Sequence, residues 1–244
     1  FRAMGVHIEG PEHGNVTIEG VGLRGLKAPN APLDMGNSGT AMRLMSGILA
    51  GQAFDSTLIG DASLSKRPMK RVTNPLALMG ARVDSQGEKG VPPLVIHGGS
   101  ALKGIQYDLP MASAQVKSCV LLAGLYAEGE TSVTEPAPTR DHTERMLRGF
   151  GYAVKTEGNR MSLVGGGELT ATDIDVPADI SSAAFSMVAA SIAPNSDVVL
   201  QHVGINPTRT GVIDILRLMG ADITLTNEKE VGGEPVADIR VRSA

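Results

Sequence analysis

The sequence predicts an α/β protein built from repeated units of about 70 residues. The first observation is a pattern that occurs three times: the end of a helix, then a glycine, then an apolar run. The glycines of this pattern are Gly80, Gly151 and Gly220, and successive ones are 71 and 69 residues apart. The second is a loop before each of these helices that joins helix-capping residues to an arginine, namely Arg67, Arg140 and Arg209. Short strand-like runs between the helices complete a unit of strand, helix, strand, helix, strand, strand.

The elements follow in chain order. Residues 1–21 look like the tail of a further unit, with the end of a helix followed by a strand. Amphipathic or apolar helices are expected at residues 39–51, 114–127 and 181–193. Strands are expected at residues 56–59, 94–97, 105–109, 131–134, 161–164, 174–176, 198–200 and 237–241.

The helices at 114–127 and 181–193 are apolar almost all round. A helix of this kind is typical of a buried layer, because it has no polar face to turn toward water. We therefore expect helices packed inside and sheets outside.

Composition narrows the class of protein. The 244 residues are 42% hydrophobic and 20% charged, which is ordinary for a globular protein. The net charge of -4, with no basic patch and only 3% aromatic residues, argues against nucleic acid as a partner. No apolar run approaches the roughly 18 residues of a membrane span, so no membrane partner is expected.

Histidine and cysteine give little sign of special chemistry. The five histidines lack metal-ligand spacing, so no metal is expected. Cys119 is the only cysteine and lies in an apolar run, which predicts a buried core residue rather than a reactive thiol. A chain that cannot form an internal disulfide suits a reducing compartment, and we expect a cytoplasmic protein.

The most informative stretch runs from Asp34 to Arg43, DMGNSGTAMR. Small residues let the backbone approach a ligand closely, and a helix that begins here points free N–H groups at a carboxylate or phosphate. A simple helix cap preceded by a turn explains the same residues. The segment alone leaves both interpretations open.

Four ordered motifs together resemble the enolpyruvyl transferases, and within them the branch that acts on shikimate 3-phosphate. They are GNSGTAMR at 36–43, KRPM at 66–69, ASAQVKS at 112–118 and TRDHTE at 139–144, and the resemblance covers essentially the whole chain. It implies an inside-out α/β barrel in two lobes of three units each. Residues 1–168 would form most of the N-terminal-side lobe and residues 169–244 the first unit of the other, with a hinge near the glycines at 165–167.

The resemblance also implies the site residues. Gly39, Arg67 and Gln115 would contact phosphoenolpyruvate, and Ser113, Gln115 and Arg140 would contact shikimate 3-phosphate. Many members carry two serines before the glutamine, whereas the second is Ala114 here, so Arg140 is expected to supply charge in place of the missing hydroxyl. A solvated charge at a helix entrance remains the alternative for Arg140.

Three neighbouring basic residues receive no ligand role. We expect Lys66 and Lys70, which flank Arg67, to be solvated. Arg209 repeats the arginine loop, but no family ligand contact corresponds to it, so it is expected to be structural.

The implied reaction moves the enolpyruvyl group of phosphoenolpyruvate to the 5-hydroxyl of shikimate 3-phosphate and releases phosphate, a step toward chorismate and the aromatic amino acids. It needs no metal or organic cofactor. The family's acid and base residues correspond to no position in this chain, so no catalytic residue is assigned and the chain alone is expected not to turn over. The complete protein is expected to be monomeric and, with Gly39 at the donor site, sensitive to glyphosate.

Two alternatives stay open. The branch that acts on UDP-N-acetylglucosamine shares the fold and the donor, but usually carries a reactive cysteine in the loop that here spans residues 60–68, where none is present. The other alternative is a noncatalytic lobe retained only for packing.

Overall fold

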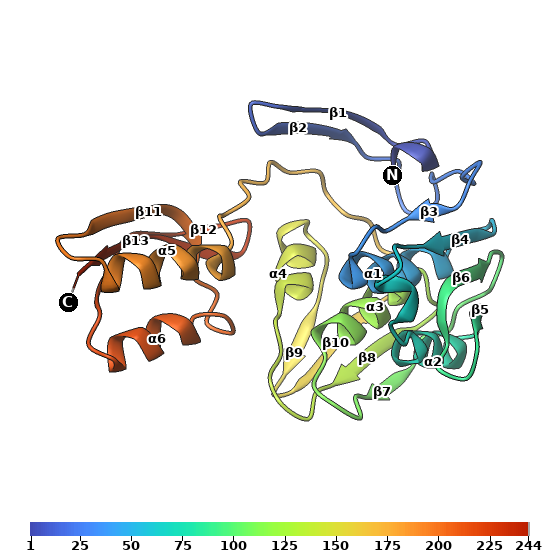
Figure 1. Cartoon of the computed structure of the whole chain (residues 1–244). Helices are drawn as coiled ribbons and strands as arrows, with labels where there is room; N and C mark the ends of the chain where they lie inside the picture. Colours follow the sequence, from blue (N-terminus) through green and yellow to red (C-terminus); the bar gives the residue numbers. More distant parts are fainter. Residues whose placement is uncertain (244) are drawn as a thin grey trace. The chain divides into compact units, whose positions relative to one another are not determined.

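The computed structural model describes residues 1–243, which divide into two compact units (Figure 1). The first unit comprises Phe1–Pro138 and Tyr152–Thr170. The second comprises Thr139–Gly151 and the residues from Ala171 onward. Thr139–Gly151 therefore lies in the middle of the first unit's sequence but clusters with the second unit.

The first unit opens with a short helix, η1 (Arg2–Met4), and a hairpin of β1 (His7–Glu12) and β2 (Asn15–Glu19). Its first sheet has the order β3-β4-β6-β5, from β3 (Leu33–Asp34), β4 (Ser56–Ile59), β5 (Arg82–Gln86) and β6 (Val91–His97). The helices of this repeat are α1 (Gly39–Ala50), η2 (Leu64–Lys66) and α2 (Lys70–Leu78).

A second sheet repeats this topology. Its order is β7-β8-β10-β9, formed by β7 (Gln106–Asp108), β8 (Glu130–Thr134), β9 (Lys155–Glu157) and β10 (Arg160–Val164). Along the chain, α3 (Ala114–Gly124) and α4 (His142–Gly149) fall between its strands. In both sheets the first two strands are parallel and the others antiparallel. A parallel pair needs a crossover, which the first helix of each repeat supplies.

Helices form the interior of the first unit. At Gly47 a Cβ atom would lie 2.3 Å from the carbonyl oxygen of Cys119, so α1 and α3 pack backbone to backbone. Most of α3, from Val116 to Gly124, is buried, which confirms the expectation of a buried helix there. The helix ends at Gly124, three residues earlier than predicted.

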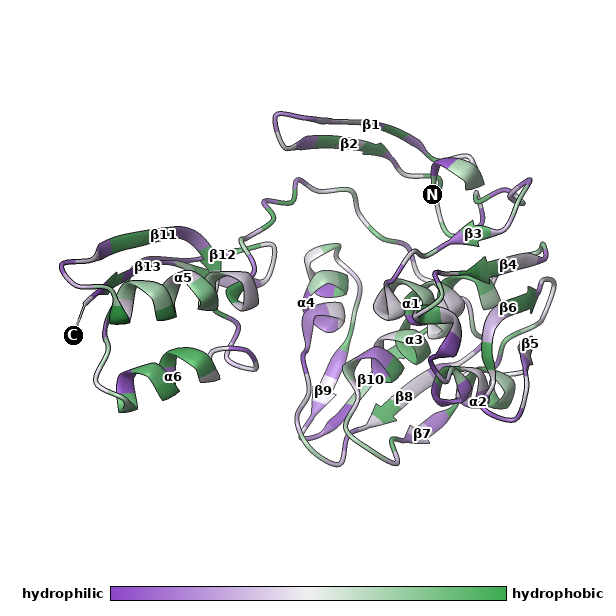
Figure 2. Ribbon diagram, in the orientation of Figure 1, coloured by the Kyte–Doolittle hydropathy of each residue, from purple (hydrophilic) through white to green (hydrophobic). Residues whose placement is uncertain are grey.

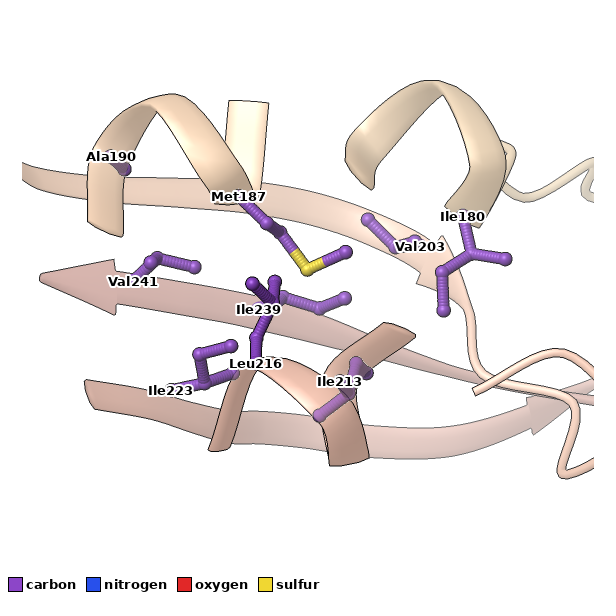
Figure 3. Close-up of a cluster of buried hydrophobic side chains, with 9 residues drawn as sticks. All are labelled: Ile180, Met187, Ala190, Val203, Ile213, Leu216, Ile223, Ile239 and Val241. Carbon is purple, nitrogen blue, oxygen red and sulfur yellow. The ribbon is translucent and has the colours of Figure 1, made fainter. Parts of the chain in front are cut away.

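The second unit contains α5 (Ile180–Ile192) and α6 (Gly211–Leu218) on a sheet of order β11-β13-β12. The strands are β11 (Asp197–Gly204), β12 (Asp222–Val231) and β13 (Glu234–Arg242). Both helices and all three strands contribute to one buried cluster, in which Met187 and Leu216 lie around Ile239 (Figure 3).

Two predictions for this unit are wrong. Residues 174–176 form no strand, because within residues 1–243 no neighbouring backbone pairs with them; the nearest pairing is a single parallel bridge from Ala178 to Val203. The side chain of Val176 is 78% exposed. Helix α5 is buried on one face only, since Phe185 and Ile192 are 81% and 76% exposed. Apolar residues, green in Figure 2, run along α5 and α6, but the described chain covers only one side of each.

The recurring glycines have one physical cause. Gly80, Gly151 and Gly220 have φ angles of 96°, 77° and 96°, the left-handed region that glycine adopts without a steric penalty. Each follows α2, α4 or α6 and donates its N–H to a carbonyl of the last turn. The repeat seen in the sequence is therefore a repeat of helix C-termini.

Candidate functional site

The start of α1 confirms the helix cap. The hydroxyl of Ser38 accepts a hydrogen bond from the N–H of Ala41 at 3.1 Å, and the carboxylate of Asp34 accepts one from the N–H of Gly36 at 2.8 Å. Gly36 has a φ of 55°, so the turn needs glycine there. These contacts fix the backbone that leads into Gly39, the first residue of the helix.

Arg67 is half-buried and is oriented by neutral partners. Its Nη2 donates to Oδ1 of Asn37 at 2.6 Å and to the hydroxyl of Ser63 at 3.3 Å. Asn37 in turn donates to Oδ2 of Asp61 at 2.6 Å. Because none of these direct partners carries a negative charge, the guanidinium is held in place without being neutralised.

The pKa of the Asp61 carboxyl lies below its ordinary value. The largest cause is the hydrogen bond from the N–H of Leu64, at 2.7 Å, and the amide of Asn37 adds to it. Asp61 is therefore a stable anion that fixes the loop before α2 and the amide that orients Arg67.

A second arginine links α1 to α3. Nη1 of Arg43 donates to Oε1 of Gln115 at 2.7 Å, and Nε2 of Gln115 donates to the hydroxyl of Thr40 at 2.7 Å. Nη2 of Arg43 lies 3.4 Å from the carbonyl oxygen of Pro68. These bonds set the direction of the Gln115 amide at the start of α3.

Positive charge gathers around Gly39. A Cβ atom at Gly39 would lie 2.8 Å from Nη1 of Arg43 and 3.2 Å from Nη1 of Arg67, so both guanidinium groups border this glycine. The pKa of Arg43 is lowered, first by burial and then by repulsion from Arg71 and Arg67. A bound anion would relieve this repulsion, and arginine forks match carboxylate and phosphate oxygens.

Ser113 and Gln115 stand at the beginning of α3. The hydroxyl of Ser113 accepts the N–H of Val116 at 3.4 Å as the helix cap, which leaves its own hydrogen free to donate. Ala114 is half-buried and offers no polar group. The structure thus brings Gly39, Arg67 and Gln115 together in the first unit.

The other basic residues divide into two kinds. Lys66 and Lys70 are exposed, as predicted. Arg209 donates to Oδ1 of Asp179 at 3.0 Å and to the hydroxyl of Ser181, at the N-terminus of α5, which fits a structural role. Arg140 belongs to the second unit and is exposed, with no hydrogen bond or ion pair to any residue within 1–243.

The described residues contain neither a cluster of metal ligands nor a membrane-spanning helix. Among residues 1–243, no three His, Cys, Asp or Glu side chains gather as metal ligands would. None of the helices in this part of the chain has the length and hydropathy needed to cross a bilayer.

The family model of EPSP synthase, 3-phosphoshikimate 1-carboxyvinyltransferase, matches residues 1–244. The chain belongs to the EPSP synthase family. It is 74% identical over 249 residues to the 3-phosphoshikimate 1-carboxyvinyltransferase of Hydrogenovibrio crunogenus, covering 100% of this chain and 56% of the relative. It is 71% identical over 242 residues to the enzyme of the same name from Methylococcus capsulatus, covering 99% and 55%.

A solved EPSP synthase from Acinetobacter baumannii is 69% identical and superimposes with a TM-score of 0.93, over 100% of this chain and 55% of that one. This likeness confirms the expected fold class, the inside-out α/β barrel of the EPSP synthase family. The chain spans about half the length of the relatives it matches.

Sequence reasoning missed part of this site. The stretch at residues 34–43 indicates an anion site that includes Arg43 but not the bond from Arg43 to Gln115, and no role is predicted for Arg71 or Thr40. The basic run from Lys66 to Arg71 was the available signal for Arg71. For Thr40 there was none, because only the packing of α1 on α3 brings its hydroxyl to Gln115.

Proposed function

We propose that the complete protein containing this chain is a 3-phosphoshikimate 1-carboxyvinyltransferase. The 5-hydroxyl of shikimate 3-phosphate loses its proton as its oxygen forms a bond to C2 of phosphoenolpyruvate, while C3 gains a proton. The bond from C2 to the phosphate oxygen then breaks, C3 loses a proton, and inorganic phosphate leaves with 5-enolpyruvylshikimate 3-phosphate. The observation that carries the proposal is the set of arginines around Gly39, in a chain of this family.

Phosphoenolpyruvate is a small polyanion, and Gly39, Arg67 and Gln115 are proposed to bind it. Arg67 offers a fork held by neutral partners, and Gly39 leaves room beside it. Arg43 would act with them by fixing the amide of Gln115. Fixed charges of this kind also stabilise the negative charge that develops in the tetrahedral intermediate.

Shikimate 3-phosphate is proposed to contact Ser113, Gln115 and Arg140. The free hydrogen of the Ser113 hydroxyl suits a phosphate oxygen, and the amide of Gln115 suits hydroxyl groups. The exposed guanidinium of Arg140 would supply the charge that Ala114 cannot.

The organisation of the complete protein belongs to the same proposal. Residues 1–168 would form most of one lobe and residues 169–244 the first unit of the other. We expect a cytoplasmic monomer that binds neither nucleic acid nor membranes, and that uses no metal or organic cofactor. Proton transfer is assigned to no residue of this chain, so the 244 residues alone should release no phosphate above background.

Substitution of Arg67 in the complete protein tests the proposal. Arg67→Ala is expected to raise the KM for phosphoenolpyruvate by roughly ten-fold to a hundred-fold, the loss of one charge-assisted hydrogen bond. Arg67→Lys should recover only part of it, since an ammonium group lacks the planar fork. Lys66→Ala, at the neighbouring exposed residue, is the matched control and should change little.

Two results would contradict the proposal. If Arg67→Ala lowers only the melting temperature and leaves the KM unchanged, the loop serves packing, as in a noncatalytic lobe. If UDP-N-acetylglucosamine replaces shikimate 3-phosphate as the acceptor in phosphate release, the acceptor is assigned wrongly.

A further inference from the structure

A buried amide joins three segments of the second unit. Asn206 follows β11 and is 2% exposed. Its Nδ2 donates to Oδ1 of Asp141 at 2.8 Å and to Oε2 of Glu234 at 3.0 Å. Its Oδ1 accepts the N–H and the hydroxyl of Thr208 at 2.9 and 2.7 Å. Both donor hydrogens and both lone pairs of the amide are used, so its orientation is fixed.

The two carboxylates hold the beginning of α4. Oδ2 of Asp141 accepts Nε of Arg145 at 2.8 Å, and Oε1 of Glu234 lies 2.6 Å from Nδ1 of His142. Nη1 of Arg145 also donates to the carbonyl oxygen of Gly233 at 3.0 Å. The first turn of α4 is thereby attached to the hairpin of β12 and β13 and to the loop after β11.

Arg140 immediately precedes this anchored turn. A nearby carboxylate can pair with an arginine and so prevent that arginine from binding an anionic ligand. Arg209 is an example, because its Nη2 donates to Oδ1 of Asp179 at 3.0 Å. Asp141 stands beside Arg140 in the sequence, yet its two oxygens are occupied by Asn206 and Arg145. Arg140 therefore keeps an exposed guanidinium without a carboxylate partner among residues 1–243.

We propose that Asn206 is a positioning residue for Arg140. By binding Asp141 and Glu234 at once, it fixes the helix turn that directly follows Arg140 and keeps the carboxylate of Asp141 away from the guanidinium of Arg140. This inference rests on the proposed function, because it assumes that Arg140 meets the phosphate of shikimate 3-phosphate.

Position 206 requires a neutral side chain that donates a hydrogen bond to each of two carboxylates. Aspartate has the same shape as asparagine, but it cannot donate and would place a third negative charge beside two carboxylates. An aliphatic residue would leave both carboxylates without their shared donor. Asn206→Ala in the complete protein is the milder perturbation, since it frees Oδ1 of Asp141 without adding charge.

The test is a double-mutant cycle of Asn206→Ala and Arg140→Ala in the complete protein. Each single substitution should raise the KM for shikimate 3-phosphate about ten-fold, the equivalent of one weakened charge-assisted contact. The double variant should be no worse than Arg140→Ala alone, because Asn206 acts only through that arginine. The KM for phosphoenolpyruvate should stay within about two-fold in every variant, since the substitutions leave the donor contacts intact.

A control variant and a conservative variant distinguish a specific effect on binding from a general loss of stability. Asn227→Gly removes another amide-to-carboxylate bond of the second unit, to Asp238 at 2.7 Å, and should leave both KM values unchanged. Asn227 has a φ of 53°, which glycine accepts. Glu234→Gln keeps the shape of Glu234 and should raise the KM for shikimate 3-phosphate less than Asn206→Ala does.

The inference is wrong if the double variant raises the KM for shikimate 3-phosphate by the product of the two single effects of Asn206→Ala and Arg140→Ala. A lower melting temperature of Asn206→Ala with an unchanged KM would also overturn it. If Arg140→Ala itself leaves the KM unchanged, Arg140 has no ligand to be positioned for, although enolpyruvyl transfer by the wild type would still stand. Absence of that transfer in the wild type would instead contradict the proposed function.

Discussion

Replacing Gly39 with alanine should damage the proposed phosphoenolpyruvate site while sparing the fold. Gly39 is buried at the first position of α1, and its φ lies outside the left-handed region, so alanine can adopt the same backbone. The close atoms are the far ends of two flexible side chains, Arg43 and Arg67. Stability should be unchanged or higher by up to about 1 kcal/mol, through the reduced entropy of the unfolded chain.

The size of the effect on binding follows from the distances. Nη1 of Arg43 would lie 2.8 Å from the new methyl carbon, whereas such atoms pack at about 3.5 Å, so the guanidinium must move by about 0.7 Å. Arg43 holds Gln115 at 2.7 Å, and Arg67 must also give way slightly. Such a shift weakens binding by about one charge-assisted hydrogen bond, so we expect a roughly ten-fold or larger rise in the KM for phosphoenolpyruvate.

The assay is steady-state phosphate release by the complete protein, with phosphoenolpyruvate varied at saturating shikimate 3-phosphate. Glyphosate should inhibit the wild type, and the methyl group should weaken that inhibition as well. Gly211→Ala is the matched control, because Gly211 begins α6 and a Cβ atom there would meet nothing within 4 Å. An unchanged KM for Gly39→Ala, or an equal change for Gly211→Ala, would refute the reasoning.

Three further predictions concern stability and reactivity. Lys117 and Glu135 form a buried ion pair at 3.0 Å, so Lys117→Met should lower the free energy of unfolding by about 3–5 kcal/mol in urea denaturation; a loss under about 1 kcal/mol would contradict this. Burial raises the pKa of the Cys119 thiol to about 12, so a thiol reagent near pH 8 should modify it only after unfolding, and rapid labelling of the native protein would count against this. Burial raises the pKa of Asp141, but hydrogen bonds from Arg145 and Asn206 outweigh it and hold the pKa below its ordinary value. The resulting stability is present above about pH 4 and is lost as the pH falls through the folded value, so the melting temperature of Asp141→Asn should vary less than wild type in that acidic range; parallel curves would exclude it.

The sequence was informative wherever a local conformation needs a particular residue. The glycines after α2, α4 and α6 sit at positive φ, and a cap residue marks α1 and α3, so the repeat was visible before any packing was known. Strands on the edge of a sheet were harder to find. In β12 the apolar and polar residues alternate only as far as Thr226; residues 227–230 are polar and exposed, so only the pairing with β13 defines the rest of the strand.

Helix α5 shows why burial was overestimated. Its sequence is apolar on nearly every side, which predicts that every side is buried. Whether a side is buried depends, however, on which other segments pack against it. Within residues 1–243 the sheet and α6 cover one face, and Phe185 remains exposed. The apolar residues of a helix indicate which surfaces tend to be buried, and the segments that pack against the helix determine which surfaces are buried.

The sequence by itself determined the repeat, the fold class and the motifs of the EPSP synthase family, because caps, glycine turns and apolar periodicity are local properties of the chain. Only the tertiary structure decided which side chains meet. Arg43 and Gln115 are 72 residues apart and bond because α1 packs on α3. Asn206 and Asp141 are 65 residues apart and bond because α4 docks beside the loop after β11. Such contacts arise from the packing of distant segments, which no local pattern encodes.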